Sequence, residues 1–119
     1  MAMAAATIYH NPRCTKSRQA MQVINELGID VEVVEYLKAP PDESTLRSII
    51  AKLDGPASGL VRRDGWKELG IEAADVATDD GVVDVLLRHP HLLQRPVVVK
   101  GDRAVIGRPT ERVGELLGH

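Results

Sequence analysis

The sequence predicts an α/β fold with a mixed four-stranded sheet, in which a β-α-β unit and a later β-β-α unit flank a helical insertion. Near the start of the chain, two β-prone runs at 7–10 and 31–36 enclose a helical pattern. Near its end, two β-rich runs are separated only by Gly101 and Asp102, which is a strong hairpin signal. The stretch between the two units, at about 42–90, has helical rather than alternating periodicity.

The first unit takes its order from turn and cap residues. The run 7–10 leads into an Asn-Pro turn, and a helix then starts at Thr15 and stops at Gly28, which suits a helix C-terminus. The apolar residues of this helix recur at helical spacing, at Ala20, Val23, Ile24 and Leu27. The run 31–36 is rich in β-branched residues, and we expect it to pair in parallel with the first strand because a helix connects the two.

The insertion is predicted to hold several helices. Prolines and acidic residues precede a helix whose apolar face is formed by Leu46, Ile49, Ile50 and Leu53. Shorter helical fragments are expected at 58–63 and 66–69. Thr78 and the two aspartates that follow it suit the N-terminus of a further helix, which ends before Pro90.

The closing unit is predicted to contain strands at 97–100 and 103–106 and a final helix at 109–117. This order of elements is the layout of a thioredoxin- or glutaredoxin-like fold. The chain has 119 residues and no linker-like change in composition. We therefore expect residues 1–119 to form a single domain, with 1–6 as a disordered lead-in.

Composition narrows the possible classes of function. The net charge is -2, from 15 basic and 17 acidic residues, so no broad positive field for nucleic acid or an anionic membrane is expected. No apolar run approaches the about 20 residues that a membrane-spanning helix needs. The single cysteine rules out an internal disulfide framework and, without a secretory signal, favours the cytoplasm.

Cys14 is placed where a thiol can be ionised. It lies between the Asn-Pro turn and the predicted helix start, so its sulfur would face free backbone N–H groups and the positive end of the helix dipole. Arg13, Lys16 and Arg18 add positive charge nearby, and a lysine at a helix N-terminus suggests that an anion binds there. The alternative is a buried, inert cysteine whose basic neighbours point into solvent. The combination of strand, proline turn and helix start favours a reactive thiolate.

The residues that follow Cys14 exclude two familiar thiol mechanisms. A redox CxxC pair needs a second cysteine at position 17, where the chain has Ser17. A phosphatase-type loop needs five residues between cysteine and arginine, whereas Arg18 follows after only three. Because the chain has no resolving cysteine, a product formed on Cys14 must be released by an external thiol, such as glutathione or a partner redox protein.

Two later arginines lie beside prolines at the edges of the predicted hairpin. In a thioredoxin-like sheet the turn before the third strand lies beside the first β-α turn, so Arg95 is expected to reach the space around Cys14. Arg108 follows the hairpin, and Arg62, or its neighbour Arg63, is a third candidate. Guanidinium forks suit a tetrahedral oxyanion. The alternative is that each arginine is a solvated surface charge.

Four segments, YHNPRCTKSR, LVRR, RPVVV and IGRPTE, occur in that order along the chain. Together they resemble the glutaredoxin-linked arsenate reductases of the ArsC family, over residues 7–117. The resemblance implies that Cys14 attacks arsenate and that three arginines bind the oxyanion, namely Arg62, Arg95 and Arg108. It also implies that His10 favours the thiolate, that Ser17 assists through a hydrogen bond near the thiol, and that the Arg95–Pro96 bond is cis.

The resemblance also implies a mechanism and partners. The Cys14 thiolate would form an adduct with arsenate, glutathione would be the co-substrate, and glutaredoxin would clear the Cys14–glutathione mixed disulfide, with no bound cofactor. Two other functions stay open. The Spx-type regulators share this fold and bind RNA polymerase without catalysis, although they usually carry CxxC where this chain has Ser17. The second alternative is a glutathione-linked reductase of a different oxidised substrate.

The remaining candidates have structural interpretations. His89 and His91, together with His10 and His119, show no ligand spacing typical of zinc, so no metal site is expected. Trp66 lies in a polar stretch and is expected to pack a small helical cap over the sheet rather than to bind a ligand.

Overall fold

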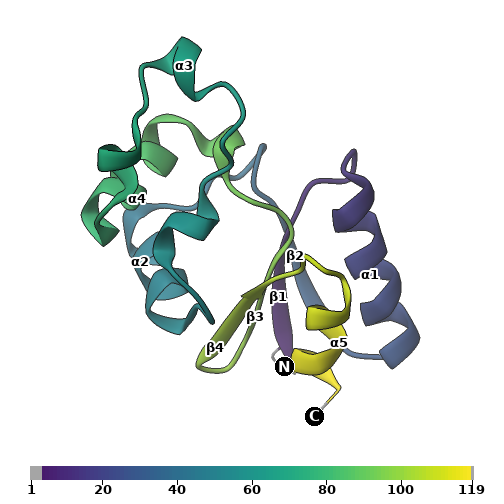
Figure 1. The fold of residues 1–119 in the computed structure, drawn as a ribbon. Helices are drawn as coiled ribbons and strands as arrows, with labels where there is room; N and C mark the ends of the chain where they lie inside the picture. The colour runs from purple at the N-terminus through teal and green to yellow at the C-terminus, as the bar shows by residue number, and fades with distance from the viewer. Residues whose placement is uncertain (1–3, 119) are drawn as a thin grey trace.

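A computed structural model describes residues 4–118 of the chain (Figure 1). Strand β1 (Ala6–His10) lies beside β2 (Val31–Glu35), and α1 (Thr15–Leu27) connects the two. The hairpin of β3 (Val97–Lys100) and β4 (Arg103–Ile106) completes one sheet of order β2-β1-β3-β4. The predicted thioredoxin-like fold with a mixed four-stranded sheet is therefore confirmed.

The pairing of the strands places the start of α1 at one end of the sheet. β1 pairs in parallel with β2 and antiparallel with β3, and the hairpin pairs β3 with β4. In the parallel pair His10 lies opposite Glu35, so the next residues, Asn11 and Tyr36, leave the sheet at the same level. The carboxyl ends of β1 and β2 consequently meet at the turn that contains Cys14.

The helical insertion between β2 and β3 contains more helical elements than the sequence predicts. Its elements are α2 (Glu43–Lys52), α3 (Trp66–Leu69), α4 (Asp79–Arg88) and three 3-10 turns, Ala57–Leu60, Ala73–Val76 and Pro90–Leu92. The predicted caps are present, because Asp42 accepts the Thr45 N–H at 2.8 Å and Thr78 accepts the Gly81 N–H at 3.1 Å. These two caps start α2 and α4 at the positions that the sequence indicates.

Three boundaries differ from the prediction. Ala5 and Ala6 are not part of a disordered lead-in, because the Ala5 N–H donates to the Asp30 carbonyl and Ala6 pairs with Val31; residues 1–3 lie outside the described part. The fragment expected at 58–63 stops at Leu60, since Val61 turns extended and bridges to Leu93. The last helix, α5 (Glu111–Leu117), starts after a turn in which the carbonyls at 109 and 110 accept N–H groups three residues on.

Helices cover both faces of the sheet. α1 and α5 pack on one face and α2 and α4 on the other, as Figure 1 shows. Successive side chains of β3 point to opposite faces of the sheet. Val97 belongs to the core on the insertion side, and Val98 belongs to the core under α1 and α5. Both cores are built almost entirely from aliphatic side chains, as expected for a chain without phenylalanine. They hold the loops at the end of the sheet in place from two sides.

Candidate active site

Cys14 is the residue immediately before the first turn of α1. Its backbone is extended, its carbonyl accepts the Arg18 N–H at 3.0 Å, and its own N–H donates to the Asn11 carbonyl at 3.0 Å. The Asn11 side chain accepts the Arg13 N–H at 3.0 Å. Asn11 thus closes the turn between β1 and α1, and the turn sets the half-buried sulfur over the free N–H groups of the helix start.

Ser17 and His10 form a buried pair beneath this turn. The Ser17 hydroxyl lies 2.6 Å from His10 Nδ1 and accepts the Asn11 backbone N–H at 3.0 Å. Burial lowers the pKa of His10, against a smaller opposing effect of Glu35, so its imidazole is neutral near pH 7. The hydroxyl accepts from Asn11, and the direction of its hydrogen bond with Nδ1 follows the tautomer of the neutral ring. His10 therefore reaches the Cys14 loop through Ser17 and as a neutral group rather than as a cation.

Replacing Ser17 by alanine is expected to lower the free energy of unfolding by about 1–3 kcal/mol, because the Asn11 N–H and His10 Nδ1 lose their partner in a buried place. Ser17 is 0% exposed. Urea unfolding monitored by circular dichroism measures the change. The matched control is Ser48→Ala on the outside of α2, which removes an exposed hydroxyl and should shift stability by no more than about 0.5 kcal/mol. Equal effects of the two substitutions would contradict the prediction.

The lowered pKa of His10 predicts an acid-sensitive fold. The unfolded chain protonates this imidazole below about pH 6.5, whereas the folded chain does so only at lower pH. In that interval the unfolded state binds more protons, so the free energy of unfolding falls as the pH drops from about 6.5 toward the folded pKa. His10→Asn should make this part of the stability curve flatter than in the wild type. Parallel curves from pH 7.5 to pH 5 would show that His10 does not contribute.

Arg108 and Arg95 lie next to the thiol although they are far from it in sequence. Arg108 donates through Nη2 to Cys14 Sγ at 3.6 Å and through Nε to the Arg95 carbonyl at 2.7 Å. The Gly107 N–H donates to the Pro96 carbonyl at 2.8 Å, which ties the segments before β3 and after β4 together. The Arg95–Pro96 bond is cis, as the family resemblance implies, and so is Arg108–Pro109.

The Arg95 guanidinium lacks partners for two of its nitrogens. Nε and Nη1 are buried, and among residues 4–118 no group accepts a hydrogen bond from either. Buried donors on a cation are almost always paired, because leaving them unpaired costs several kcal/mol per group in desolvation. An anion that bound beside Cys14 would supply the missing acceptors. The two open donors therefore favour an anionic ligand at this site.

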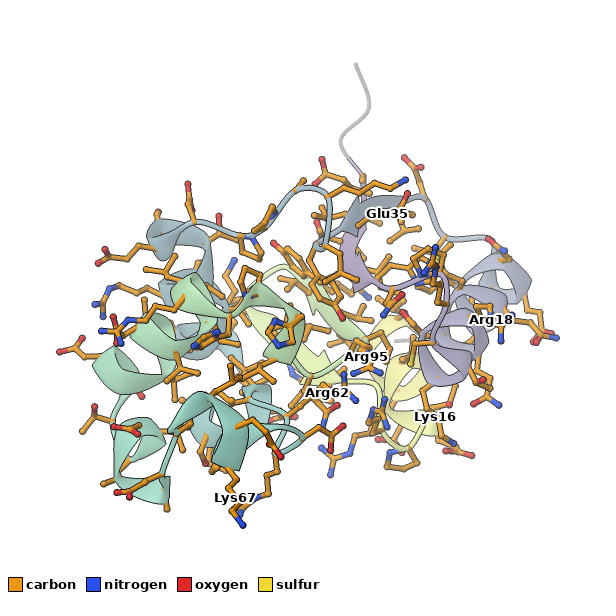
Figure 2. The ribbon with its side chains drawn as sticks, turned by 90° about the horizontal axis from the view of Figure 1, so that it is seen from above. Lys16, Arg18, Glu35, Arg62, Lys67 and Arg95 are labelled. Atoms are coloured by element: carbon orange, nitrogen blue, oxygen red, sulfur yellow. The ribbon has the colours of Figure 1, made fainter. Side chains whose placement is uncertain are left out.

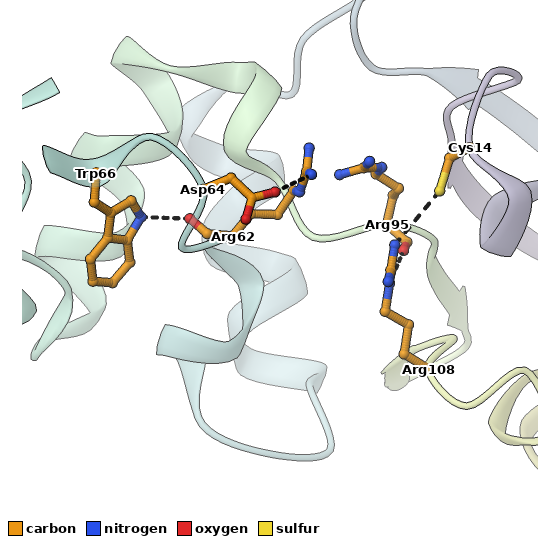
Figure 3. Close-up of polar contacts among 6 residues, drawn as sticks. All are labelled: Cys14, Arg62, Asp64, Trp66, Arg95 and Arg108. Atoms are coloured by element: carbon orange, nitrogen blue, oxygen red, sulfur yellow. Dashed lines mark hydrogen bonds and ion pairs between the residues drawn. The ribbon is translucent and has the colours of Figure 1, made fainter. Parts of the chain in front are cut away.

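Arg62, rather than Arg63, faces this site. Figure 3 shows the Arg62 guanidinium directed toward Arg95, and Figure 2 places both between the insertion and α1. Arg62 is 27% exposed and forms an ion pair with Asp64. Arg63 lies on the surface, where its guanidinium stacks over Trp66 at 5.2 Å from the ring centroid. Of the two candidate arginines, Arg62 is the one whose side chain faces the space beside Arg95.

The sequence prediction gave Trp66 only a packing role, and the structure adds a second one. The ring packs against the core on the insertion side, as expected, and its Nε1–H donates to the Arg62 carbonyl. The Arg62 N–H in turn donates to the Leu92 carbonyl at 2.7 Å. The Arg62 backbone is therefore held by hydrogen bonds at both its N–H and its carbonyl, while its side chain extends toward Arg95.

The surroundings of Cys14 favour the thiolate. Burial alone would raise the pKa of the thiol, but the backbone N–H groups of Ser17 and Lys16 and the charge and hydrogen bond of Arg95 together lower it below its ordinary value. The nearby basic side chains that the sequence emphasised play no such part: Arg13, Lys16 and Arg18 are exposed. The positive charge at the sulfur comes instead from arginines distant in sequence.

Tyr36 is a site residue that the sequence prediction missed. It is 1% exposed, and its phenol lies close enough to interact with Asn11, Arg95, Arg62 and Cys14. Burial raises its pKa more than the two arginines and Asn11 lower it, so the phenol stays protonated and can donate a hydrogen bond. The parallel register offered a signal, since Tyr36 follows β2 directly opposite Asn11.

The described residues contain neither a recognisable metal-binding group nor a membrane-spanning helix. Between residues 4 and 118, no group of three or more His, Cys, Asp or Glu side chains is arranged to hold a metal ion. The rings of His89 and His91 contact each other edge to face, with centroids 6.0 Å apart. Within the same residues, no helix is both long and apolar enough to cross a membrane.

Comparison with known proteins identifies a family whose matched region contains the site. The ArsC family matches residues 9–116, which run from β1 to α5 and include every residue of the site described above. The chain belongs to the ArsC family. This ArsC chain is 42% identical over 113 residues to a protein named arsenate reductase from Neisseria meningitidis serogroup A, which covers 92% of the chain and 96% of that relative.

Two further proteins are similar to this chain along most of its length. An Escherichia coli protein, also named arsenate reductase, is 38% identical over 117 residues, covering 97% of the chain and 82% of the relative. A solved structure described as arsenate reductase from Vibrio cholerae superposes with a TM-score of 0.83 at 32% identity, over 98% of this chain and 100% of that one. The ArsC fold is therefore shared along nearly the whole chain.

Proposed function

We propose that this ArsC protein reduces arsenate to arsenite, with glutathione as the thiol reductant and glutaredoxin as the protein that regenerates it. The observation that carries the proposal is the pair of unpartnered buried nitrogens of Arg95 beside a thiol of lowered pKa. Arg108 and Arg62 add two guanidinium groups on other sides of the same space. Three such forks suit a tetrahedral, doubly charged oxyanion.

The proposed reaction starts with the Cys14 thiolate. Its sulfur attacks the arsenic atom of arsenate, an As–OH bond breaks, and the hydroxide leaves as water after it takes up a proton. The arginines bind the remaining oxygens and stabilise the charge that builds on them. Tyr36, protonated and close to the sulfur, is placed to donate a hydrogen bond to one of these oxygens. The product of this step is a covalent Cys14–arsenate adduct.

An external thiol completes the reaction. The glutathione sulfur attacks the Cys14 sulfur, the S–As bond breaks, and its electron pair passes to arsenic, which leaves as arsenite. The two sulfurs are thereby oxidised to a Cys14–glutathione disulfide, and glutaredoxin reduces this by thiol–disulfide exchange. The chain has one cysteine, so it has no thiol of its own for this step. The reaction requires a reducing compartment, which suits the expected cytoplasmic location.

The test is arsenite production from arsenate by the purified protein, with glutathione and glutaredoxin each omitted in turn. We expect turnover only with both present, and accumulation of a Cys14–glutathione adduct, seen by intact-protein mass spectrometry, when glutaredoxin is left out. Absence of arsenite with both reductants present would overturn the proposal. If the thiol nevertheless reduced a model disulfide with glutathione, the alternative of a reductase for a different oxidised substrate would take its place.

A further inference from the structure

A pocket opens beside the site on the side of the helical insertion. Its volume is about 470 Å³, and its walls include Arg62, Arg63, Asp64, Gln94 and Arg108. Small-molecule sites typically enclose about 300–1,000 Å³, so the pocket lies within the usual size range for a small-molecule ligand. A single tetrahedral oxyanion fills far less. Arg62 and Arg108 border both this pocket and the space around Cys14, so a ligand here would lie one side chain away from the thiol.

The charge of the pocket favours an anionic ligand. Three of its lining residues are arginines and one is acidic. Arg108 and Arg62 are directed toward the thiol site, whereas Arg63 is held at the outer rim by its stacking on Trp66. Asp64 offsets part of this positive charge, because its carboxylate forms an ion pair with Arg62. The Asp64 side chain is 74% exposed. The half-buried Gln94 offers an amide that can pair with a peptide group.

We propose that this pocket binds the small anionic thiol that releases the product from Cys14, with Arg63 attracting the carboxylate groups of that thiol. The proposal rests on the proposed function and assigns a binding site to its reductant. A peptide thiol with carboxylates at its ends matches the pocket in charge and in size. Its sulfur would enter from the insertion side, past Arg62, and attack the Cys14 sulfur of the adduct, from which arsenite is displaced.

The test uses no arsenate, so it can be separated from the proposed function. The Cys14 thiolate attacks one sulfur of a small disulfide, the S–S bond breaks, a new S–S bond forms to Cys14, and one small thiolate leaves. The second-order rate is measured by mass spectrometry with glutathione disulfide, which is anionic, and with cystamine, which is cationic. The ratio of the two rates reports the charge preference, and intrinsic differences between the reagents cancel when variants are compared.

Two neighbouring substitutions should change this ratio in opposite directions. Arg63→Gln removes a positive charge from the rim and is expected to lower the ratio of anionic to cationic rates about fivefold, whereas Asp64→Asn removes the opposing charge and should raise it about threefold. The control, Arg103→Gln, removes another exposed arginine, which lies at the hairpin turn, at the far end of β4. At 0.15 M salt it should leave the ratio within about 1.5-fold, because its charge lies beyond the screening length.

Each outcome decides the proposal. Opposite shifts for Arg63→Gln and Asp64→Asn, with an unchanged control, support it. A ratio unaffected by Arg63→Gln, or the same shift in Arg103→Gln, would overturn it and point to a reductant that docks elsewhere, such as a protein thiol. A misfolded variant cannot produce the rise expected for Asp64→Asn. If the wild type makes no arsenite but shows these shifts, the pocket assignment stands and only the proposed reduction of arsenate is wrong.

Discussion

Cys14→Ser is expected to reduce arsenite production by a factor on the order of 10⁴ or more. The serine hydroxyl is scarcely ionised at neutral pH, so the N–H groups and guanidinium groups that stabilise the thiolate have no comparable nucleophile to act on. Losses of this size are typical when a covalent nucleophile is removed. The measurement is the rate of arsenite release with saturating glutathione and glutaredoxin.

A companion measurement on the wild type isolates the thiol. The rate of Cys14 alkylation by iodoacetamide should rise with pH to a midpoint below that of an ordinary cysteine, because the pKa of this thiol is lowered. Cys14→Ser should keep its fold, and anions such as phosphate should still raise its melting temperature, since the arginines remain. Arsenite release by the serine variant near the wild-type rate would remove Cys14 from the mechanism.

Arg95→Gln should produce the second largest effect, a fall of about 10²–10³ in kcat/KM for arsenate. The substitution removes the only guanidinium in the site with two buried, unpartnered nitrogens, among the residues that the structure describes. The pKa of Cys14 should rise at the same time, because the Arg95 charge helps to lower it. Arg95→Lys should recover only part of the activity, since an ammonium keeps the charge but loses the planar fork.

Stability distinguishes this result from simple misfolding. Without an oxyanion, the wild type carries buried donors that have no acceptor, so Arg95→Gln is expected to leave the free energy of unfolding unchanged or to raise it by about 1 kcal/mol. The matched control, Arg88→Gln, removes an exposed arginine from α4 and should change neither activity nor stability measurably. A large drop in stability for Arg95→Gln would mean that the guanidinium serves the fold instead.

The fold could be predicted because its elements are specified locally. Gly28 ends α1 in the left-handed conformation that glycine favours, Thr78 caps α4, and the hairpin strands lie where their β-branched residues indicate. The boundaries that differed depend on partners distant in sequence. Val61 leaves the predicted helical fragment to bridge with Leu93, and no local pattern predicts such a bridge.

The sequence predicted part of the membership of the site, and it predicted the contacts within the site less well. Cys14, Arg95 and Arg108 come together as expected, because their turns follow or precede strands that share one end of the sheet. Charge close in sequence proved misleading, since Lys16 and its basic neighbours point into solvent while the effective cations come from 81 and 94 residues away. Asp64 went unnoticed because an acidic loop residue has no signature until its ion pair is seen.

The three arginines belong to three different segments of the chain. Arg62 is carried by the insertion, Arg95 by the connection into β3, and Arg108 by the turn that leads to α5. An oxyanion held by all three would act as a removable clamp between the insertion and the sheet. Occupancy should then suppress amide hydrogen exchange in the insertion and slow its proteolysis, with a free-energy gain of about 2.7 kcal/mol at a hundredfold excess over Kd. A larger supply of substrate would then lengthen the lifetime of the protein against proteolysis as well as raise its rate of turnover.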